Sequence, residues 1–232
     1  NVPALVSLSD FYNRRGDMRA YLSVSNRLFA IDVLPLSEKV RIFRQLTLDT
    51  RFYRDHFFQL NELISTLAVR YPDDPEVIEL YAGHLMRSGE ADQALALYKL
   101  HLNDLPPRLD HYRAVIDIES YLKRLDSVYL YIDRALVIFP EETELYALRG
   151  HAQGYAGRLP EAIDSYRRAL RYAATDSLRG AVWGYIGDAW HQMETQSESR
   201  AEKARFRRRS FAAYDKALGY RYNNPSVLNN YA

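Results

Sequence analysis

The stretch TELYALRGHAQGYAGRLPEAIDSYRRALRYAATD, which runs from Thr143 to Asp176, decides the fold because it is one unit of a repeat. Residues of the same kind return at a constant step of 34 positions on its N-terminal side. The sets are the prolines Pro72, Pro106 and Pro140, the apolar residues Ala94, Val128 and Ala162, and the larger residues Tyr98, Ile132 and Tyr166. A constant step with each residue type in its own phase is the signature of a repeat protein.

The quoted unit divides into two amphipathic helices joined near Gly157. Its second half places Ala162 and Tyr166 four residues apart on one stripe, and its first half does the same with Tyr146 and Gly150. Two helices approach closely only where side chains are small, so Gly150 and Ala162 mark the expected crossing point of the pair. The tyrosines are large enough to fill the space beside it.

Prolines separate one helix pair from the next. A proline has no amide hydrogen and moves its predecessor out of the helical region, so Pro72, Pro106 and Pro140 each end a second helix. The dipeptides Asp74-Pro75 and Asn224-Pro225 place an N-cap acceptor before a proline at a first helical position. The sequence therefore predicts an all-α chain made of stacked helical hairpins.

These residues resemble the tetratricopeptide repeat family, whose 34-residue unit carries the pattern W-x2-L-G-x2-Y, then A-x3-F, then A and P. With Thr143 as the first position, Arg149 and Ala174 depart from the pattern. The matching residues are Tyr146, Gly150, Ala162, Tyr166 and Ala169. The resemblance implies a right-handed superhelical solenoid of antiparallel helix pairs.

Nearly the whole chain can be laid out in such units, which we expect to form one solenoid domain. The predicted units are 1–35, a degenerate 36–74, 75–108, 109–142, 143–176, 177–224 with an insertion at about 194–204, and 225–232 as the start of a truncated further repeat. In the degenerate unit we expect the first helix over Ser37–Leu48 and an aromatic-bearing loop at Asp49–Phe57.

The last stretch, PSVLNNYA, is too short to cap a solenoid. Because an uncapped repeat exposes an apolar face, we expect the native protein to continue with further repeats or another domain. An uncapped end can also pair two copies of the chain, so the sequence is compatible with a monomer or with a dimer formed through this end.

The composition excludes several classes of protein. The formal charge is +1, from 31 basic and 30 acidic residues, so no overall attraction to nucleic acid or to a membrane surface is expected. The chain contains no cysteine, which excludes disulfides and cysteine-ligated zinc. No apolar run is long enough to cross a bilayer. Cytoplasmic and periplasmic locations both remain compatible with these properties.

The resemblance also implies a binding groove lined by equivalent positions on the first helix of each unit. Carried over to this sequence, the groove residues are Glu76, Glu79, Arg87, Asp110, Arg113, Asp117, Tyr121, Glu144, His151, Tyr155, Asp188 and His191. The set is acidic overall, with Tyr121 and Tyr155 as aromatic anchors, and suits a peptide that carries Lys or Arg. The alternative interpretation is an ordinary solvated helix face.

One binding mode of the family is not expected here. Members that bind the terminal carboxylate of chaperone tails use Lys and Asn at two of these groove positions. This chain has the pairs Glu79/Gly83, Arg113/Asp117, Ala147/His151 and Gly184/Asp188 instead. A terminal carboxylate would therefore lack its set of charge-assisted partners.

The stretch RAEKARFRRR at 200–209 is a second candidate surface. Its basic residues are Arg200, Lys203, Arg205, Arg207, Arg208 and Arg209. One interpretation is a patch for nucleic acid, anionic lipid or an acidic protein. The other is a lengthened second helix whose outer face is solvated.

The sequence shows no motif for chemistry. The six histidines form neither H-x-x-x-H nor H-E-x-x-H, and no phosphate-binding loop or nucleophile elbow is present, so no catalytic, metal or cofactor residue is predicted. One interpretation places His151 and His191 on one groove from adjacent units, and the alternative is that they are ordinary polar groups of the surface. The leading hypothesis is a non-enzymatic scaffold that binds a protein or peptide. The alternatives are an adaptor for an anionic surface and an accessory region of a larger enzyme or envelope protein.

Overall fold

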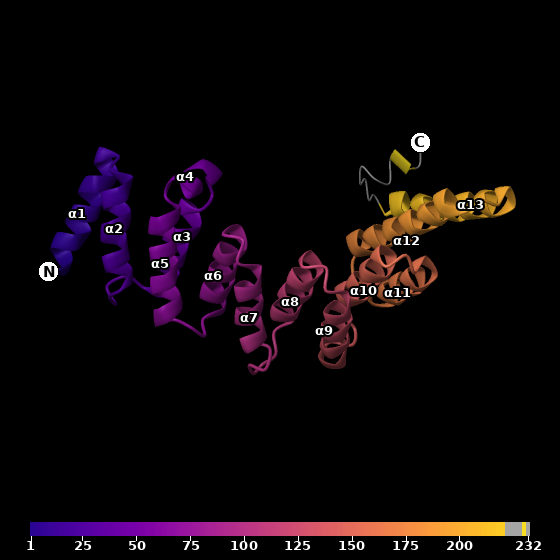
Figure 1. Ribbon diagram of the computed structural model, residues 1–232, viewed down its shortest axis with the longest axis horizontal. Helices are drawn as coiled ribbons and strands as arrows, with labels where there is room; N and C mark the ends of the chain where they lie inside the picture. Colours follow the sequence, from indigo (N-terminus) through magenta and orange to yellow (C-terminus); the bar gives the residue numbers. More distant parts are fainter. Residues whose placement is uncertain (221–228, 231–232) are drawn as a thin grey trace. The chain divides into compact units, whose positions relative to one another are not determined.

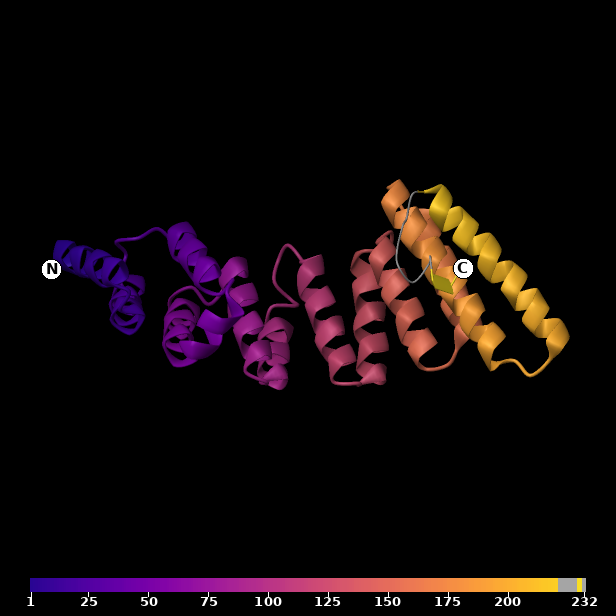
Figure 2. The ribbon, with the colours of Figure 1, turned by 90° about the horizontal axis from the view of Figure 1, so that it is seen from above.

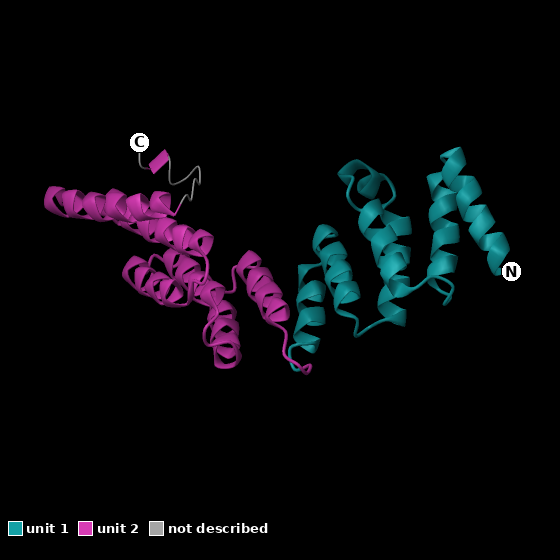
Figure 3. Cartoon of the chain, turned by 180° about the vertical axis from the view of Figure 1, so that it is seen from behind, with its two compact units in different colours: residues 1–103 teal, residues 104–232 magenta. Residues whose placement is uncertain are grey.

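The computed structural model describes residues 1–220, 229 and 230, and this part of the chain consists of α-helices and turns without a β-strand. Successive helices run in opposite directions and are joined by short connections (Figure 1). They fall into two compact units, residues 1–103 and 104–232, which Figure 3 distinguishes by colour. The prediction of an all-α chain of helix pairs is confirmed.

Unit 1 contains seven helices. They are α1 (Val2–Arg15), α2 (Met18–Phe29), α3 (Leu36–Leu46), α4 (Thr50–Asp55), α5 (Phe57–Arg70), α6 (Pro75–Arg87) and α7 (Ala91–Leu100). Its core gathers large apolar side chains from α2, α3 and α5 that solvent does not reach. These side chains include Leu22, Phe29, Val40, Phe43, Leu60, Leu63, Ile64 and Leu67. Burial of this apolar surface is the main force that holds the unit together.

A lysine lies inside this apolar core. Lys39 in α3 is fully buried, and its ammonium group donates hydrogen bonds to the carbonyl oxygens of Phe29 and Ile31, each at 2.9 Å. It also donates to the hydroxyl group of Tyr71 at 3.1 Å. Phe29 is the last residue of α2, so its carbonyl has no partner within the helix, and the lysine supplies one. Lys39 therefore joins the ends of α2 and α5.

The expected loop at Asp49–Phe57 is wrong, because six of these residues form the short helix α4. The Asp49 carboxylate accepts hydrogen bonds from the backbone amides of Arg51 and Phe52, at 2.7 and 3.1 Å, and so caps the helix. Tyr53 then anchors α4, since its hydroxyl group lies 2.6 Å from Nδ1 of the buried His84 in α6. The tertiary contact stabilises a helix that is too short to form alone.

The predicted helix start at Asp74-Pro75 is confirmed. The Asp74 carboxylate accepts hydrogen bonds from the backbone amides of Glu76 and Val77, at 3.0 and 3.1 Å, and Pro75 opens α6. The corresponding pair Asn224-Pro225 lies outside the described residues.

Unit 2 contains the remaining helices of the described part. They are α8 (Leu109–Tyr121), α9 (Leu125–Ile138), α10 (Thr143–Tyr155), α11 (Leu159–Tyr172), α12 (Asp176–Gln196) and α13 (Arg200–Gly219). One core cluster of this unit is formed by side chains of α11, α12 and α13, among them Ala162, Ile163, Tyr166, Val182, Ile186 and Ala213.

Two helix pairs of unit 2 cross in the same way. A β-carbon at Gly150 would overlap the ring of Tyr166, and one at Gly187 would overlap the ring of Tyr214. Glycine is therefore required at both positions, because any side chain there would push the pair α10–α11 or α12–α13 apart. The crossing point expected at Gly150 is confirmed, and Gly187 repeats it.

The last helix pair is much longer than the others. Helix α12 has 21 residues and α13 has 20, and Figure 2 shows them antiparallel and side by side. The insertion expected at about 194–204 covers the last turn of α12, the connection at 197–199 and the start of α13. The extra residues thus extend two helices instead of forming a separate loop.

The stretch 225–232, expected to start a further repeat, lies outside the described residues except for Asn229 and Asn230. Within the described part of the chain, no helix is both long and apolar enough to cross a membrane.

Candidate functional site

A cavity of about 260 Å³ opens in unit 2 between α10, α11 and α12. The cavity exists because part of its wall is formed by the small residues Gly154, Ala162 and Ala189. The remaining lining residues are His151, Leu159, Tyr166, Tyr185, Asp188 and Gln192. Two predicted groove residues, His151 and Asp188, are therefore brought together from successive repeats.

His151 is held by two tyrosines. Its Nδ1 lies 2.9 Å from the hydroxyl oxygen of Tyr166, and its ring meets the ring of Tyr185 edge to face, with centroids 4.5 Å apart. Desolvation lowers the pKa of His151, which the charge of Asp188 partly opposes, and burial raises the pKa of Tyr166. At neutral pH the tyrosine hydroxyl therefore donates to Nδ1 of an uncharged imidazole, and the imidazole proton resides on Nε2.

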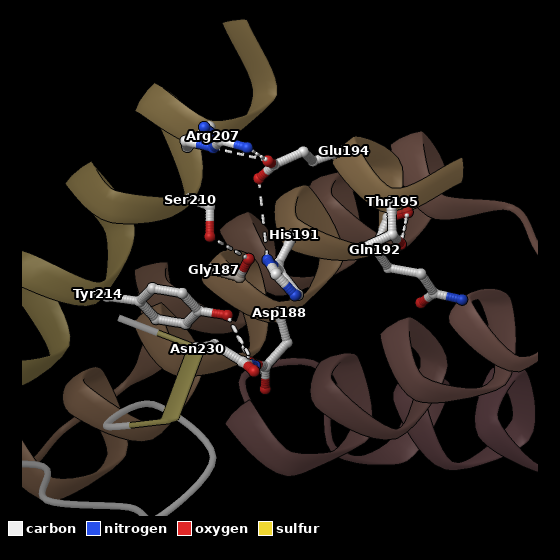
Figure 4. Close-up of polar contacts among 10 residues, drawn as sticks. All are labelled: Gly187, Asp188, His191, Gln192, Glu194, Thr195, Arg207, Ser210, Tyr214 and Asn230. Atoms are coloured by element: carbon white, nitrogen blue, oxygen red, sulfur yellow. Dashed lines mark hydrogen bonds and ion pairs between the residues drawn. The ribbon is translucent and has the colours of Figure 1, made fainter. Parts of the chain in front are cut away.

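Asp188 follows the crossing glycine Gly187 as His151 follows Gly150, so it occupies the equivalent place in the next repeat, and Figure 4 shows its partners. Its Oδ1 accepts hydrogen bonds from the hydroxyl group of Tyr214 at 2.8 Å and from Nδ2 of Asn230 at 3.1 Å. Burial and the nearby carboxylate both raise the pKa of Tyr214, so this hydroxyl keeps its proton as the donor. Both partners are uncharged groups, so neither supplies a positive charge to the carboxylate at the cavity wall.

A second acidic group of unit 2 surrounds Arg113 in α8. Its guanidinium forms ion pairs with Asp110 at 3.4 Å, with Glu142 at 3.8 Å and with Glu144 at closer range. Desolvation raises the pKa of Asp117, which the charge of Arg113 partly offsets. The charge of Arg113, a predicted groove residue, is thus compensated by three neighbouring carboxylates, and Asp117 lies close enough to feel its charge.

Two predicted aromatic anchors are exposed. Tyr121 ends α8 and Tyr155 ends α10, and their side chains are 69% and 68% exposed. A tyrosine that packs in the core is covered, as Tyr166 is, so neither of these two rings contributes much to folding.

The groove residues predicted in unit 1 are engaged by other side chains. Arg44 in α3 forms ion pairs with Glu76 at 3.2 Å and with Glu79 at 3.6 Å. The guanidinium of Arg87 lies over the ring of Tyr53, 4.8 Å from its centroid. These residues therefore contribute contacts between α3, α4 and α6.

His191 does not line the cavity. Its Nδ1 lies 3.8 Å from Oε2 of Glu194, a nearly buried carboxylate that Arg207 binds at 2.6 and 2.7 Å (Figure 4). Of the two histidines, only His151 lines this cavity. His191 lies instead beside the ion pair between Glu194 and Arg207, which ties α12 to α13.

The basic stretch 200–209 lies on α13 and divides into two sets. Two of its basic residues contact α12. Arg207 forms an ion pair with Glu194, and Arg209 stacks over Trp190 with its guanidinium carbon 4.6 Å from the ring centroid. The other four, Arg200, Lys203, Arg205 and Arg208, are exposed and form no ion pair within the described part of the chain.

Sequence reasoning missed the part that Tyr185 plays, because it is not a position of the family pattern. What recurs in the structure is a hydrogen bond between a first-helix residue and the tyrosine of the second helix, although the spacing along the sequence differs. His151 and Tyr166 form one such pair, and Asp188 and Tyr214 form the next. Among the described residues, no group of three or more His, Cys, Asp or Glu is arranged to hold a metal ion.

No protein-family model and no curated protein matches this sequence. Its similarity to solved structures lies in the fold. A thermophilic TPR protein of Thermus thermophilus is 18% identical, with a TM-score of 0.57 over 84% of this chain and 96% of that one. A tetratricopeptide repeat protein of Parabacteroides merdae is 11% identical, with a TM-score of 0.57 over 98% of this chain and 81% of that one.

A third structure is YrrB, described as a TPR protein with an unusual peptide-binding site, which is 11% identical. Its TM-score is 0.52 over 82% of this chain and 89% of that one. These structures are built from antiparallel helix pairs of the kind that the step of 34 residues predicts here. The chain therefore has the tetratricopeptide repeat fold.

Proposed function

We propose that this chain is a protein-binding scaffold whose unit 2 takes up a peptide segment of its partner at the cavity between α10 and α12. The observation that supports the proposal is the cavity itself. It is lined by His151 and Asp188, which occupy the same position in successive repeats, and by Gln192 and Gly154 one turn further along the helices. Equivalent first-helix positions are those at which repeat proteins of this fold present a binding surface.

The chemistry of the cavity suits recognition better than packing. A binding pocket combines apolar and aromatic walls with a few polar groups that fix orientation. Here Leu159, Ala162 and the two tyrosines provide the walls, whereas His151, Asp188 and Gln192 provide the polar groups. The likeness to YrrB, which carries a peptide-binding site of its own, supports the same class of function.

A glycine substitution tests the proposal without removing any existing contact. Gly154 lies in the cavity wall, and a β-carbon there would meet no atom within 4 Å. Gly154→Leu should therefore fill the mouth of the cavity and leave the helix intact. The matched control is Gly219→Leu in α13, which is equally unobstructed and lies away from the cavity.

The assay is selection of peptides from a random display library by the purified chain, followed by calorimetric measurement of the Kd of the enriched peptides. Support for the proposal would be peptides whose affinity falls at least tenfold with Gly154→Leu and stays unchanged with Gly219→Leu. Peptides that bind the wild-type chain and the Gly154→Leu variant equally well would place the binding surface elsewhere.

A second candidate is an adaptor that binds an anionic surface through 200–209. It is favoured by the four exposed cations of α13 that lack an ion pair in the described residues. Binding to heparin at increasing NaCl concentration tests it, with Arg205→Gln/Arg208→Gln compared against Arg168→Gln/Arg171→Gln in α11. Equal salt dependence of the two double variants would count against this surface.

A further inference from the structure

We infer that the group which enters the cavity between α10 and α12 is a cation, the side chain of a lysine or arginine in a basic segment of the partner. The inference rests on the proposed function and specifies its ligand. Asp188 is the one lining residue that is charged at neutral pH, because His151 is neutral and the other seven are uncharged side chains.

Asp188 also lacks a counter-ion of its own. Within the described part of the chain its carboxylate is bound only by the hydroxyl group of Tyr214 and the amide of Asn230. Two other charged side chains of unit 2 do have ionic partners, since Glu194 is paired with Arg207 and Arg113 with its carboxylates. A partly desolvated carboxylate with neutral partners only is a site that attracts a cation strongly.

The hydrogen bonds hold this carboxylate in place before any ligand arrives. Tyr214 and Asn230 also lie within hydrogen-bond distance of each other, at 3.2 Å, so the three groups form a closed network around Oδ1. A charge that is already oriented loses little side-chain entropy when the ligand binds. The arrangement in Figure 4 is therefore that of a preorganised anionic acceptor.

The walls favour the same type of ligand. Tyr166 and Tyr185 both line the cavity, with ring centroids 5.6 Å apart. Aromatic faces attract an ammonium or guanidinium group, and the long apolar stem of either side chain can cover Leu159 and Ala162. An anionic side chain would meet the carboxylate of Asp188 with no cation in the cavity to compensate it.

Acidic side chains outside the cavity favour further positively charged residues in the peptide, next to the one that enters the cavity. Asp110, Asp117, Glu142 and Glu144 surround Arg113 on α8 and the start of α10, which leaves an excess of negative charge on helices that carry groove positions. Such an excess steers a cationic segment toward the face and raises its association rate. A segment with several basic residues fits both the cavity and this acidic cluster.

The test uses the whole chain and peptides enriched from the random library. The chain is expected to select peptides with Lys or Arg at a fixed position. Replacement of that residue by norleucine, or by citrulline where it is Arg, should lower the affinity at least tenfold. Asp188→Asn, which keeps the oxygen that accepts from Tyr214, should lower the affinity of the charged peptide by a similar factor and should not affect the norleucine or citrulline peptide.

The control for charge is Asp164→Asn in α11, where the carboxylate is exposed and paired with Arg167 at 2.9 Å. It changes the net charge equally and should leave the affinity unchanged. Circular dichroism and thermal unfolding of each variant check that the fold is retained.

The outcomes separate this inference from the proposed function. One outcome is that Gly154→Leu abolishes binding while the enriched peptides carry no basic residue, or while Asp188→Asn binds them as the wild type does. In either case the cavity binds peptides, and the inference that its ligand is a cation is contradicted. If Gly154→Leu leaves the binding of basic peptides intact, the cavity is not the binding site and the proposed function is contradicted.

Discussion

The ring of Tyr166 in α11 occupies the space in which a β-carbon of residue 150 would lie. The closest approach of the two helices thus depends on the absence of a single methyl group. The same relationship holds between Tyr214 and Gly187 in the following pair. Close helix contacts in this unit are therefore specified twice by a glycine and a tyrosine from opposite helices.

Gly150→Ala should accordingly destabilise the chain, although alanine is the better helix former. The buried aromatic ring cannot move without displacing its neighbours, so we expect a loss of about 1–3 kcal/mol in the free energy of unfolding. Gly83→Ala in α6 is the control, because a β-carbon there meets no atom within 4 Å, and it should stabilise by up to about 1 kcal/mol. Urea denaturation measures the free energy of unfolding of both variants. An unchanged free energy of unfolding in Gly150→Ala would show that the two helices cross less closely than described.

Lys39 should contribute to stability despite its apolar surroundings. Lys39→Met removes the donor to the carbonyl oxygens of Phe29 and Ile31 and leaves both without this partner. Each unsatisfied buried carbonyl costs about 1–3 kcal/mol, so the midpoint of urea unfolding should fall clearly. Lys203→Met on the exposed face of α13 should change the free energy of unfolding by no more than about 0.5 kcal/mol. Equal midpoints for the two variants would contradict the structural role of Lys39.

The contact between Glu194 and Arg207 should hold the distal ends of α12 and α13 together. Arg207→Ala leaves the nearly buried Glu194 carboxylate without its strongest partner and should destabilise this end of the pair by about 1–3 kcal/mol. Arg208→Ala, one residue further and exposed without an ion pair in the described residues, should have no effect beyond about 0.5 kcal/mol.

Amide hydrogen exchange of α12 and α13 locates the effect. Faster exchange near residues 190–210 in Arg207→Ala alone is the expected result. Identical exchange in both variants would mean that the ion pair contributes nothing to the stability of the hairpin.

The stability of unit 1 should decrease in mild acid through His84. Desolvation lowers the pKa of this histidine, and Arg87 acts in the same direction while Glu90 opposes it. Both ring nitrogens are engaged, Nδ1 with the Tyr53 hydroxyl group and Nε2 with Oδ1 of Asn61 at 3.0 Å. The native state therefore favours the neutral ring, and its contribution is complete above the unfolded-state pKa of about 6.5.

As the pH falls through that value, the unfolded chain takes up the proton first and stability is lost, down to the lowered native pKa. NMR titration of the imidazole signals gives the native pKa, and urea unfolding between pH 8 and 5 gives the slope. In His84→Gln the slope should be smaller. A native pKa at or above 6.5 would show that desolvation does not dominate at this site.

The periodic features of the sequence were sufficient to predict the helix pairs of this chain and the crossing at Gly150, because small residues and tyrosines recur in phase. The short helix α4 could not be predicted from periodicity. It depends on the cap at Asp49 and on the contact between Tyr53 and His84, which are 31 residues apart.

The candidate site was predictable only in part. Repeat phase named His151 and Asp188, but it carries no information on which charges find partners. Arg113 was predicted as a groove residue, and neighbouring carboxylates compensate its charge. Repeat phase likewise did not indicate that His191 lies beside Glu194, one turn along the same helix, and outside the lining of the cavity. Ion pairing of this kind depends on side-chain geometry that spacing alone does not fix.

The two hydroxyl contacts of unit 2 have a consequence for how such a chain can change. The tyrosine at one repeat position holds an imidazole in one unit, through Tyr166 and His151, and a carboxylate in the next, through Tyr214 and Asp188. The same scaffold therefore tolerates a neutral or an anionic group at the neighbouring position without altering its helix crossings. Substitution of the one residue at this position would therefore change the charge in one repeat while the glycine and tyrosine that set the helix crossing stay the same.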